Sequence, residues 1–343
     1  MPQITGTEMT GTSKSSQNEY RNGASKADYG VESDLVDFIL GITFEIWEQG
    51  QVELIHDYYA DSVEVFSLDG MTNNATRMVD NTYKTLETYP DRLLLADDVI
   101  TKGSTRHGFS SHRLVSPMTN QGESIFGPAT GRQILAMNIA DCEVNDGLIT
   151  REWLARDNLA IIKQLGFDPM ICASVIAKQF DDKQINWLAS EFARTVNDHA
   201  PASTSTRNLH SFAWQTLSNC WIGGSEKALE SIYAPYCVMH RAPLQKYSGR
   251  DALLKHYADW RLTFPNASLS IDHVCSQPFD ENNQRIAVRW SVAANHEGCF
   301  ANQPATGKPA YILGVTHWQV VDGRIAAEWT VFDELAVLAQ TLV

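Results

Sequence analysis

The sequence lacks the short motifs that mark several large classes of enzyme. It contains no HExxH zinc motif, no paired CxxC, no P-loop, no GxGxxG that opens a helix after a strand, and no GxSxG. The stretch His296-Glu297-Gly298-Cys299 has neither the spacing of a zinc site nor an obvious further ligand. We therefore expect neither a metal nor a nucleotide cofactor.

The sequence is also short of positive charge. Its 27 Lys and Arg residues stand against 41 Asp and Glu residues, which gives a formal net charge of −14. Binding nucleic acid requires a basic stripe that neutralises phosphates, so we expect no nucleic-acid partner. The chain also has no basic amphipathic stretch and no apolar run long enough to cross a bilayer, so we expect no membrane partner.

Cysteine is sparse and unpaired. No two of the six cysteines form a CxxC pair, which favours a reduced, cytoplasmic protein; they are Cys142, Cys172, Cys220, Cys237, Cys275 and Cys299. The N-terminal stretch is rich in Ser, Thr, Gly and Asn and lacks the apolar segment of a secretory signal. We expect residues 1–30 to form a disordered tail, because they contain almost nothing to bury.

The rest of the composition is that of a soluble globular protein, with 43% hydrophobic and 20% charged residues. A chain of 343 residues is long for one ordinary core and suits two domains.

The chain repeats one long segment. A Pro-Ala-Thr-Gly turn, an Asp-Gly turn, a Glu-Trp pair and a single Asp occur twice at the same spacing, in residues 128–157 and 304–333. Placing residues 113–164 on residues 289–340 gives about sixteen identities in roughly fifty positions, against about three by chance. A repeat of this length indicates a duplicated domain. We assign residues 31–167 to a first domain, 168–206 to a helical connector and 207–343 to a second domain.

Each half shows helical spacing first and strand alternation afterwards. The first half predicts helices at 31–47, 52–59, 77–89 and 158–165 and strands at 63–66, 110–116, 133–144 and 148–156; the second predicts helices at 209–221, 226–233 and 250–264 and strands at 268–274, 286–293, 310–320 and 324–332. Two helices are expected within 169–199 and a polar linker at 201–206. This order predicts two α+β domains, each with a curved antiparallel sheet covered by helices around a cone-shaped pocket.

These residues resemble a known family. The second half carries Asn295-His296-Glu297-Gly298-Cys299-Phe300, Pro304-Ala305-Thr306-Gly307-Lys308, Asp322-Gly323-Arg324-Ile325, Glu328-Trp329 and Asp333, and the first half carries matching turns and a closing Gln164-Leu165-Gly166. Both halves resemble the SnoaL-like polyketide cyclases, also called ester cyclase-like proteins, of the NTF2-like superfamily. The resemblance implies two tandem NTF2-like cones and a cofactor-independent enzyme of the cyclase or isomerase type.

The resemblance also implies a general acid/base. In those cyclases an Asp at the end of the last strand moves a proton during an intramolecular aldol closure, and its position corresponds to Asp157 and Asp333. Burial in an apolar pocket would raise the pKa of such a carboxyl toward working pH. Trp153 and Trp329 share strand parity with these carboxyls and are candidate substrate contacts. Alternatively, each Asp caps the helix that follows it.

Two arginines and three histidines are further candidates. Arg113 and Arg289 align across the repeat, and each could bind an anionic substrate or enolate, or lie at the surface or sheet edge. His240, His296 and His317 could each approach Asp333 as a catalytic or binding partner, or be structural.

The two halves differ at some of these positions. Asn120 and Asp141 stand in the first half where the second has His296 and His317, so we expect the second half to be the active one if only one is. Glu152 and Glu328 have the opposite parity to the Trp–Asp face and are expected at a sheet face or an interface.

The sequence leaves two functions open, together with a structural role of the tandem that can accompany either of them. The chain is an enzyme acting on a carbonyl-containing small molecule, or a non-catalytic module that binds a small molecule. In either case the tandem can act as an intramolecular pseudo-dimer or assemble as a homodimer.

Overall fold

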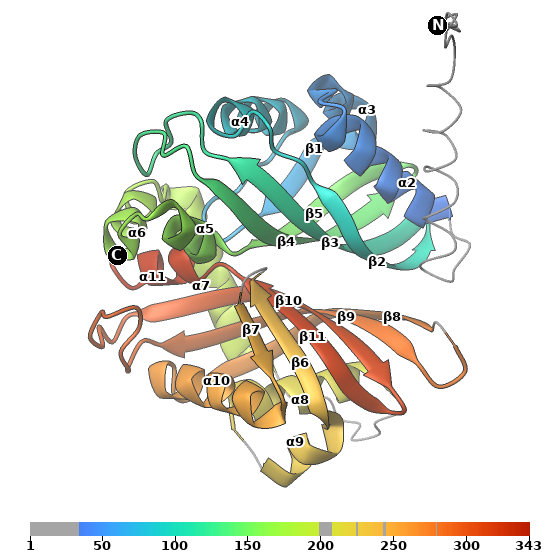
Figure 1. Cartoon of the computed structure of the whole chain (residues 1–343), viewed down its shortest axis with the longest axis vertical. Coiled ribbons are helices and arrows are strands. Elements are labelled where there is room, and N and C mark those ends of the chain that lie inside the picture. Colours follow the sequence, from blue (N-terminus) through green and yellow to red (C-terminus); the bar gives the residue numbers. More distant parts are fainter. Residues whose placement is uncertain (1–33, 199–207, 224–225, 243–244, 279) are drawn as a thin grey trace, which may run out of the picture.

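The computed structural model describes residues 34–198, 208–223, 226–242, 245–278 and 280–343. The expected tail and the expected polar linker at 201–206 lie outside these residues. Figure 1 shows two curved sheets that face each other across the middle of the molecule, with helices on their far sides. The predicted α+β class, with two curved sheets each covered by helices, is confirmed.

The first domain contains five strands and opens with a helix. That helix changes from α2 to a π-helix before it ends. The elements are α2 (Asp34–Ile42), the π-helix (Thr43–Glu48), a 3-10 turn (Val52–Leu54), α3 (Ile55–Tyr58), β1 (Tyr59–Phe66), α4 (Ala75–Thr88), β2 (Leu95–Ser104), β3 (His107–Thr119), β4 (Gln133–Asn145), β5 (Leu148–Arg156) and α5 (Asn158–Leu165).

Two connecting helices and the second domain follow. The connector is α6 (Pro169–Ala177) and α7 (Asp182–Asn197), where two helices were predicted. The second domain is α8 (Leu209–Trp221), α9 (Glu226–Ile232), β6 (Tyr233–Ala242), β7 (Gln245–Ser248), α10 (Arg250–Thr263), β8 (Ser268–Pro278), β9 (Gln284–Asn295), β10 (Pro309–Val321), β11 (Arg324–Phe332) and α11 (Glu334–Gln340). Strands β2, β6 and β7 are additional to those predicted individually.

The sheets have corresponding strand orders, β1-β5-β4-β3-β2 and β7-β6-β11-β10-β9-β8. The antiparallel prediction holds for most strand pairs, but β1 pairs with β5 in parallel and β6 pairs with β11 in parallel. In each domain, a helix and further strands separate the first long strand from its parallel partner, and this gives the chain the length to cross over.

The two Asp-Gly turns form the tight hairpins that the sequence predicts. Asp146 and Gly147 have φ values of 48° and 79°, and Asp322 and Gly323 have 48° and 75°. Two successive residues with positive φ are the requirement of a type I′ turn, which matches the twist of the flanking strands. The turns therefore fix β4 against β5 and β10 against β11.

The closing helices are attached to the sheets by a repeated glutamine. The side chain of Gln164 accepts a hydrogen bond from the Leu135 amide and donates one to its carbonyl, at 3.0 and 2.9 Å. Gln340 makes the same two bonds with Tyr311, both at 2.9 Å. The repeated Gln is therefore a structural residue that holds α5 against β4 and α11 against β10.

Each sheet has one face toward its own helices and one toward the other domain. Along β5, Ala155 belongs to a cluster at the domain interface together with Val315 and Val331. Leu154 packs with the helix-covered core of the first domain. Strand alternation thus sends neighbouring side chains into two different environments.

The interior of the second cone is filled by aromatic rings. Trp221 lies at its centre, with ring centroids 5.0 Å from Trp290, 5.6 Å from Phe332 and 5.7 Å from Trp260. These rings occupy the space in which the sequence predicts a pocket. No helix among the described residues has the length and apolar character needed to cross a bilayer.

Candidate functional site

The repeated arginines and tryptophans meet at the interface between the two domains. The guanidinium carbon of Arg113 lies 3.9 Å from the ring centroid of Trp329, and that of Arg289 lies 3.5 Å from the ring centroid of Trp153. Each arginine therefore stacks on the tryptophan of the other domain. Neither arginine is at a free surface or a sheet edge.

Each arginine is paired with a buried carboxylate. Arg113 contacts Asp97 at 2.7 Å and Asp98 at 3.6 Å. Arg289 contacts Asp141 at 2.5 Å, across the interface. Burial alone would raise the pKa of Asp141, but the Arg289 charge and His273 hold it below its ordinary value. Of these ion pairs, Arg289–Asp141 joins the two domains, whereas the Arg113 pairs lie within the first domain.

His317 belongs to the same interface. Its ring nitrogens contact Ser111 at 2.9 Å and Asp98 at 3.2 Å, both in the first domain. Burial lowers its pKa, although the Asp98 carboxylate opposes this shift. Asp141, its counterpart in the repeat, faces His273 at 3.6 Å. His317 of the second domain thus faces the Asp98 carboxylate of the first domain, and Asp141 of the first domain faces His273 of the second.

The other two histidines have separate positions. His240 stacks on Trp329 with centroids 5.2 Å apart and planes at 5°. His296 contacts the Thr306 hydroxyl at 3.1 Å and thereby supports the Pro-Ala-Thr-Gly turn. Asn120 supports the corresponding turn by accepting a hydrogen bond from the Thr130 amide at 2.8 Å. The replacement of His296 by Asn120 thus preserves a structural contact.

The structure does not bring these histidines to the candidate catalytic carboxyl. Within the described parts of the chain, no hydrogen bond or ion pair joins His240, His296 or His317 to Asp333. The three side chains belong to a ring stack, a turn and an interface ion cluster respectively.

Asp157 and Asp333 both cap helices. Asp157 accepts a hydrogen bond from the Ala160 amide at the start of α5, and Asp333 accepts one from the Ala336 amide at the start of α11, both at 3.0 Å. The Asn158 side chain also donates to Asp333 at 2.5 Å. The two carboxyls therefore lie at one junction between the domains, and the capping role is observed for both.

One of these carboxyls borders a cavity. A cavity of about 240 Å³ lies between α5, β7 and the start of α11, and it is lined by Asp157, Leu159, Ala160, Lys163, Gln164, Gln245 and Glu334. Burial, reinforced by the Glu334 charge, raises the pKa of Asp157 to about 7, while Arg241 and Lys163 oppose the shift. Asp157 is therefore positioned to gain or lose a proton near neutral pH.

Asp333 is as deeply buried as Asp157 but does not belong to the wall of this cavity. Burial raises its pKa well above the ordinary value, and the nearby Asp69 and Asp157 carboxyls add to the shift. Asp333 lines neither this cavity nor the second one described below.

Glu328 is a buried carboxylate whose position the sequence parity did not resolve. It lies on the helix-covered face of its sheet, which is one of the two positions expected for it, and not at the interface. It accepts hydrogen bonds from Tyr233 at 2.5 Å, Tyr257 at 2.6 Å, Trp318 at 2.9 Å and Thr330 at 2.8 Å. Four donors satisfy the carboxylate where no solvent reaches it.

Glu152 occupies the same place in the first domain, and it too lies inside rather than at the interface. The Tyr59 hydroxyl donates a hydrogen bond to its carboxylate at 3.3 Å. Burial raises its pKa, while Arg156 and Tyr59 oppose the shift. In the sequence, only the repetition of these two glutamates marked them as candidates. The alternation of side chains along a strand defines two faces of the sheet, but it does not say which face the helices cover.

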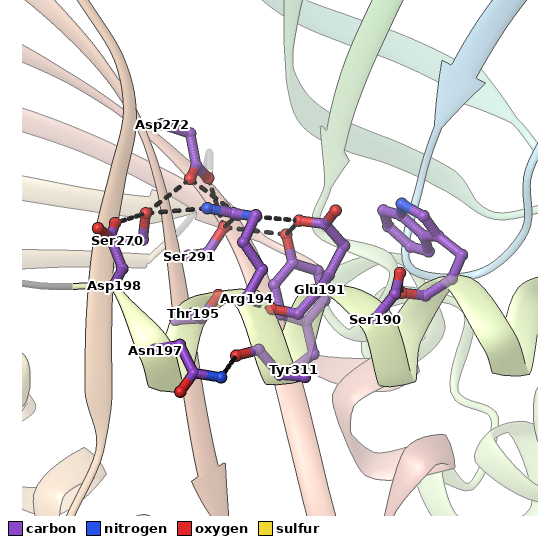
Figure 2. A network of polar contacts seen from close by, with 12 residues as sticks. Ser190, Glu191, Arg194, Thr195, Asn197, Asp198, Ser270, Asp272, Ser291 and Tyr311 are labelled. Carbon is purple, nitrogen blue, oxygen red and sulfur yellow. Dashed lines mark hydrogen bonds and ion pairs between the residues drawn. The ribbon is translucent and has the colours of Figure 1, made fainter.

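A second cavity, of about 330 Å³, lies beside α7. Residues of α7, the second sheet and the first domain contribute to its wall: Trp153, Glu191, Arg194, Asp198, Ser270, Ile271, Asp272, Arg289 and Tyr311. Figure 2 shows Arg194 in the middle of this polar network, between Glu191 on one side and Asp272 on the other. This cavity thus combines charged groups of both signs.

The second half of the chain is similar to a known family. Residues 211–341 match a family model described as SnoaL-like polyketide cyclase. Similar solved structures include wild-type IdmH from Streptomyces antibioticus, at 22% identity and a TM-score of 0.34, covering 38% of this chain and 96% of that one. A comparison with curated protein sequences found no match.

Two further solved structures are similar over the same share of the chain. A SnoaL-like polyketide cyclase from Agrobacterium tumefaciens has 20% identity and a TM-score of 0.34, and covers 40% of this chain and 100% of that chain. TsrD from Streptomyces laurentii has 18% identity and a TM-score of 0.35, and covers 39% and 95% respectively. The family match therefore applies to the second domain, and the first domain is linked to it by the internal repeat.

Proposed function

We propose that the protein is a cofactor-independent catalyst of the cyclase or isomerase type, with Asp157 as its general acid/base. The observation that carries this proposal is a buried carboxyl on the wall of a cavity at the domain junction. The match of residues 211–341 to the SnoaL-like polyketide cyclases supports the reaction class. We assign the proton transfer to Asp157 in preference to Asp333, because only Asp157 lines the cavity.

The proposed chemistry is proton transfer next to a carbonyl group. The Asp157 carboxylate removes a proton from the carbon beside the carbonyl, and the resulting carboxylic acid returns a proton after the carbon skeleton has rearranged. A pKa of about 7 keeps both forms populated near neutral pH. Lys163 lines the same cavity and supplies an ammonium group that can stabilise the enolate oxygen.

The size of the cavity limits the substrate. Its 240 Å³ is below the roughly 300–1,000 Å³ of most small-molecule sites. The cavity therefore suits a small carbonyl compound or the reacting end of a larger one.

Exchange of carbon-bound hydrogen for deuterium tests this step without knowledge of the natural substrate. Ethyl acetoacetate and 2-methylcyclohexane-1,3-dione are suitable probes, and NMR in D₂O follows their exchange above the buffer rate. We expect the wild-type rate to rise through about pH 7 and Asp157→Asn to lower it by about 100-fold or more. Asn is as good a helix cap as Asp, so this variant keeps the fold.

Asp168→Asn is the matched control. Asp168 caps α6 by accepting hydrogen bonds from the Met170 and Ile171 amides, and it does not line the cavity. This variant should exchange the probes at the wild-type rate. Equal exchange by Asp157→Asn and the wild type, or no exchange by the wild type, would overturn the proposal.

The alternative from the sequence, a binding module built as an intramolecular pseudo-dimer, is favoured by one observation. The two arginine–tryptophan contacts are reciprocal across the interface, as expected when two copies of one domain pair through equivalent faces. We propose that the tandem replaces a homodimer. Light scattering after size exclusion should then give the mass of one chain, and a stable mass of two chains would contradict this.

A further inference from the structure

The environments of the two repeated arginines differ in one respect. Asp97 and Asp272 are the extra residues of equivalent bulges, in β2 and in β8, next to Arg113 and Arg289 respectively. Asp97 accepts a hydrogen bond from the Nε of Arg113 at 2.7 Å. By the repeat, Asp272 should accept one from the Nε of Arg289.

Arg194 of α7 takes this partner instead. Its Nη2 lies 2.9 Å from Asp272, its Nε 2.8 Å from Glu191, and its Nη1 donates to Ser270 at 3.0 Å. Figure 2 shows these contacts converging on the one guanidinium. Among the described residues, no helix precedes α2 in the way that α7 precedes the second domain, and Asp97 stays with Arg113.

Arg289 is consequently left with an unused edge. Its Nη1 is paired with Asp141, but its Nε has no acceptor within the described residues. The side chain is only 8% exposed, so bulk water does not substitute freely for the missing acceptor. Arg289 also lines the 330 Å³ cavity beside α7. Arg289 thus brings to the cavity wall a guanidinium whose covered Nε lacks an acceptor, and the cavity has room for a molecule that supplies one.

The charges of the cavity wall define this molecule further. Three carboxylates line it, Glu191, Asp198 and Asp272, against the two guanidiniums of Arg194 and Arg289. A ligand with a carboxylate alone would add to this excess of negative charge. A ligand that also carries an ammonium group would offset it.

We propose that this cavity binds a small zwitterion, a molecule with one carboxylate and one amine, as a site separate from the Asp157 cavity. The ligand carboxylate takes the place of Asp272 at the free edge of Arg289. The ligand ammonium faces the acidic residues of α7. Arg194 keeps the site open as the charged partner of Asp272, which Ser270 and Ser291 also hold away from Arg289 by hydrogen bonds.

Calorimetric titration of the full chain with matched probes tests the proposal. The zwitterions are L-alanine, 4-aminobutyrate and 5-aminopentanoate, and butyrate and butylamine carry one charged group each. We expect at least one zwitterion to bind with a millimolar or lower Kd and to raise the Tm. Butyrate and butylamine should bind at least 10-fold more weakly. Absence of zwitterion binding, or equal binding of butyrate, overturns the proposal.

Two variants separate this site from general effects on the fold. Arg289→Gln removes the donor edge, and Arg194→Gln frees Asp272 to close onto Arg289; each should weaken binding at least 10-fold. Arg194 is 42% exposed, so its replacement tests the site even if Arg289→Gln fails to fold. Arg285→Gln removes another interface guanidinium that does not line the cavity, and should leave the Kd unchanged. Unchanged affinity in Arg194→Gln would refute the arrangement.

Discussion

The two domains share a strand order and a set of turns, yet their interiors are built from different side chains. The second cone is filled by Trp221, Tyr257, Trp260, Trp290 and Phe332, where the first has Trp47, Thr82, Thr85, Leu114 and Arg156 at the corresponding positions. The core of the first domain is mainly aliphatic. The same backbone fold therefore accommodates an aromatic interior in one domain and an aliphatic interior in the other. This is possible because the turns and helix caps that specify the fold lie outside the cone.

The buried glutamates show the same contrast. Glu328 has four hydrogen-bond donors from the aromatic cone, whereas Trp318 and Tyr257 are replaced in the first domain by Cys142 and Thr82. Glu152 therefore keeps weaker partners in Tyr59, Cys142 and the charge of Arg156, and burial raises its pKa. A repeated residue can thus keep its position while its electrostatic environment changes.

Removal of the central aromatic ring should have the largest effect. Trp221→Ala leaves a cavity among four packed rings and should lower the free energy of unfolding by about 3–5 kcal/mol. Trp47 occupies the equivalent place but is only half-buried, so Trp47→Ala should cost about 1–2 kcal/mol. Urea unfolding of both variants measures the difference, and equal losses would show that the cones are filled alike.

Replacement of the two buried glutamates should give a smaller difference in the free energy of unfolding than replacement of the two tryptophans. Glu328→Gln exchanges a carboxylate oxygen for an amide donor facing tyrosine and tryptophan donors, and should cost about 2–4 kcal/mol. Glu152→Gln removes a poorly paired buried acid and should cost about 1 kcal/mol or less. The same unfolding experiment at pH 7 decides this, and a more damaging Glu152→Gln would reverse the comparison.

The pH dependence of stability should report on Asp157. The carboxyl has a pKa of about 7 in the folded protein, against an ordinary value of 3.8. Between these values the folded protein holds a proton that the unfolded chain has released, so stability falls as the pH rises from about 4 to 7. The Asp157→Asn variant has no carboxyl at this position, so its stability should not fall for this reason as the pH rises.

At pH 8, Asp157→Asn should therefore be more stable than the wild type by on the order of 1–3 kcal/mol, and near pH 4 the two should agree. Asp168→Asn, the control cap, should not change the shape of the profile. Thermal melting at several pH values measures this. A destabilised Asp157→Asn at pH 8 would mean that the carboxylate is favourable as an anion.

The interface stacks should give the smallest effects and should be equal. Trp153→Leu and Trp329→Leu each remove one arginine–tryptophan contact, and each should cost about 0.5–2 kcal/mol. Unfolding curves of both variants test the symmetry. A markedly larger loss for Trp329 would show that its stack with His240 matters more than the contact with Arg113.

Much of the local structure could be predicted from the sequence. The bounds of β5, α5, α8 and β11 agree with the predicted ranges, because Asp-Gly turns and helix caps act through neighbouring residues. The candidate site was predictable only in part. The repeated Asp could be found from its position, but its cavity is formed by residues from both domains, including Gln245 and Glu334.

The sequence by itself determined the duplication, the α+β class and the turns, since each depends on identity or on spacing along the chain. Alternation also separated Glu152 from Trp153 and Glu328 from Trp329. Only the tertiary structure decided that the glutamates face the helices and the tryptophans face the other domain. A strand has two faces by its geometry, and which one is covered depends on helices and a partner sheet far away in the sequence.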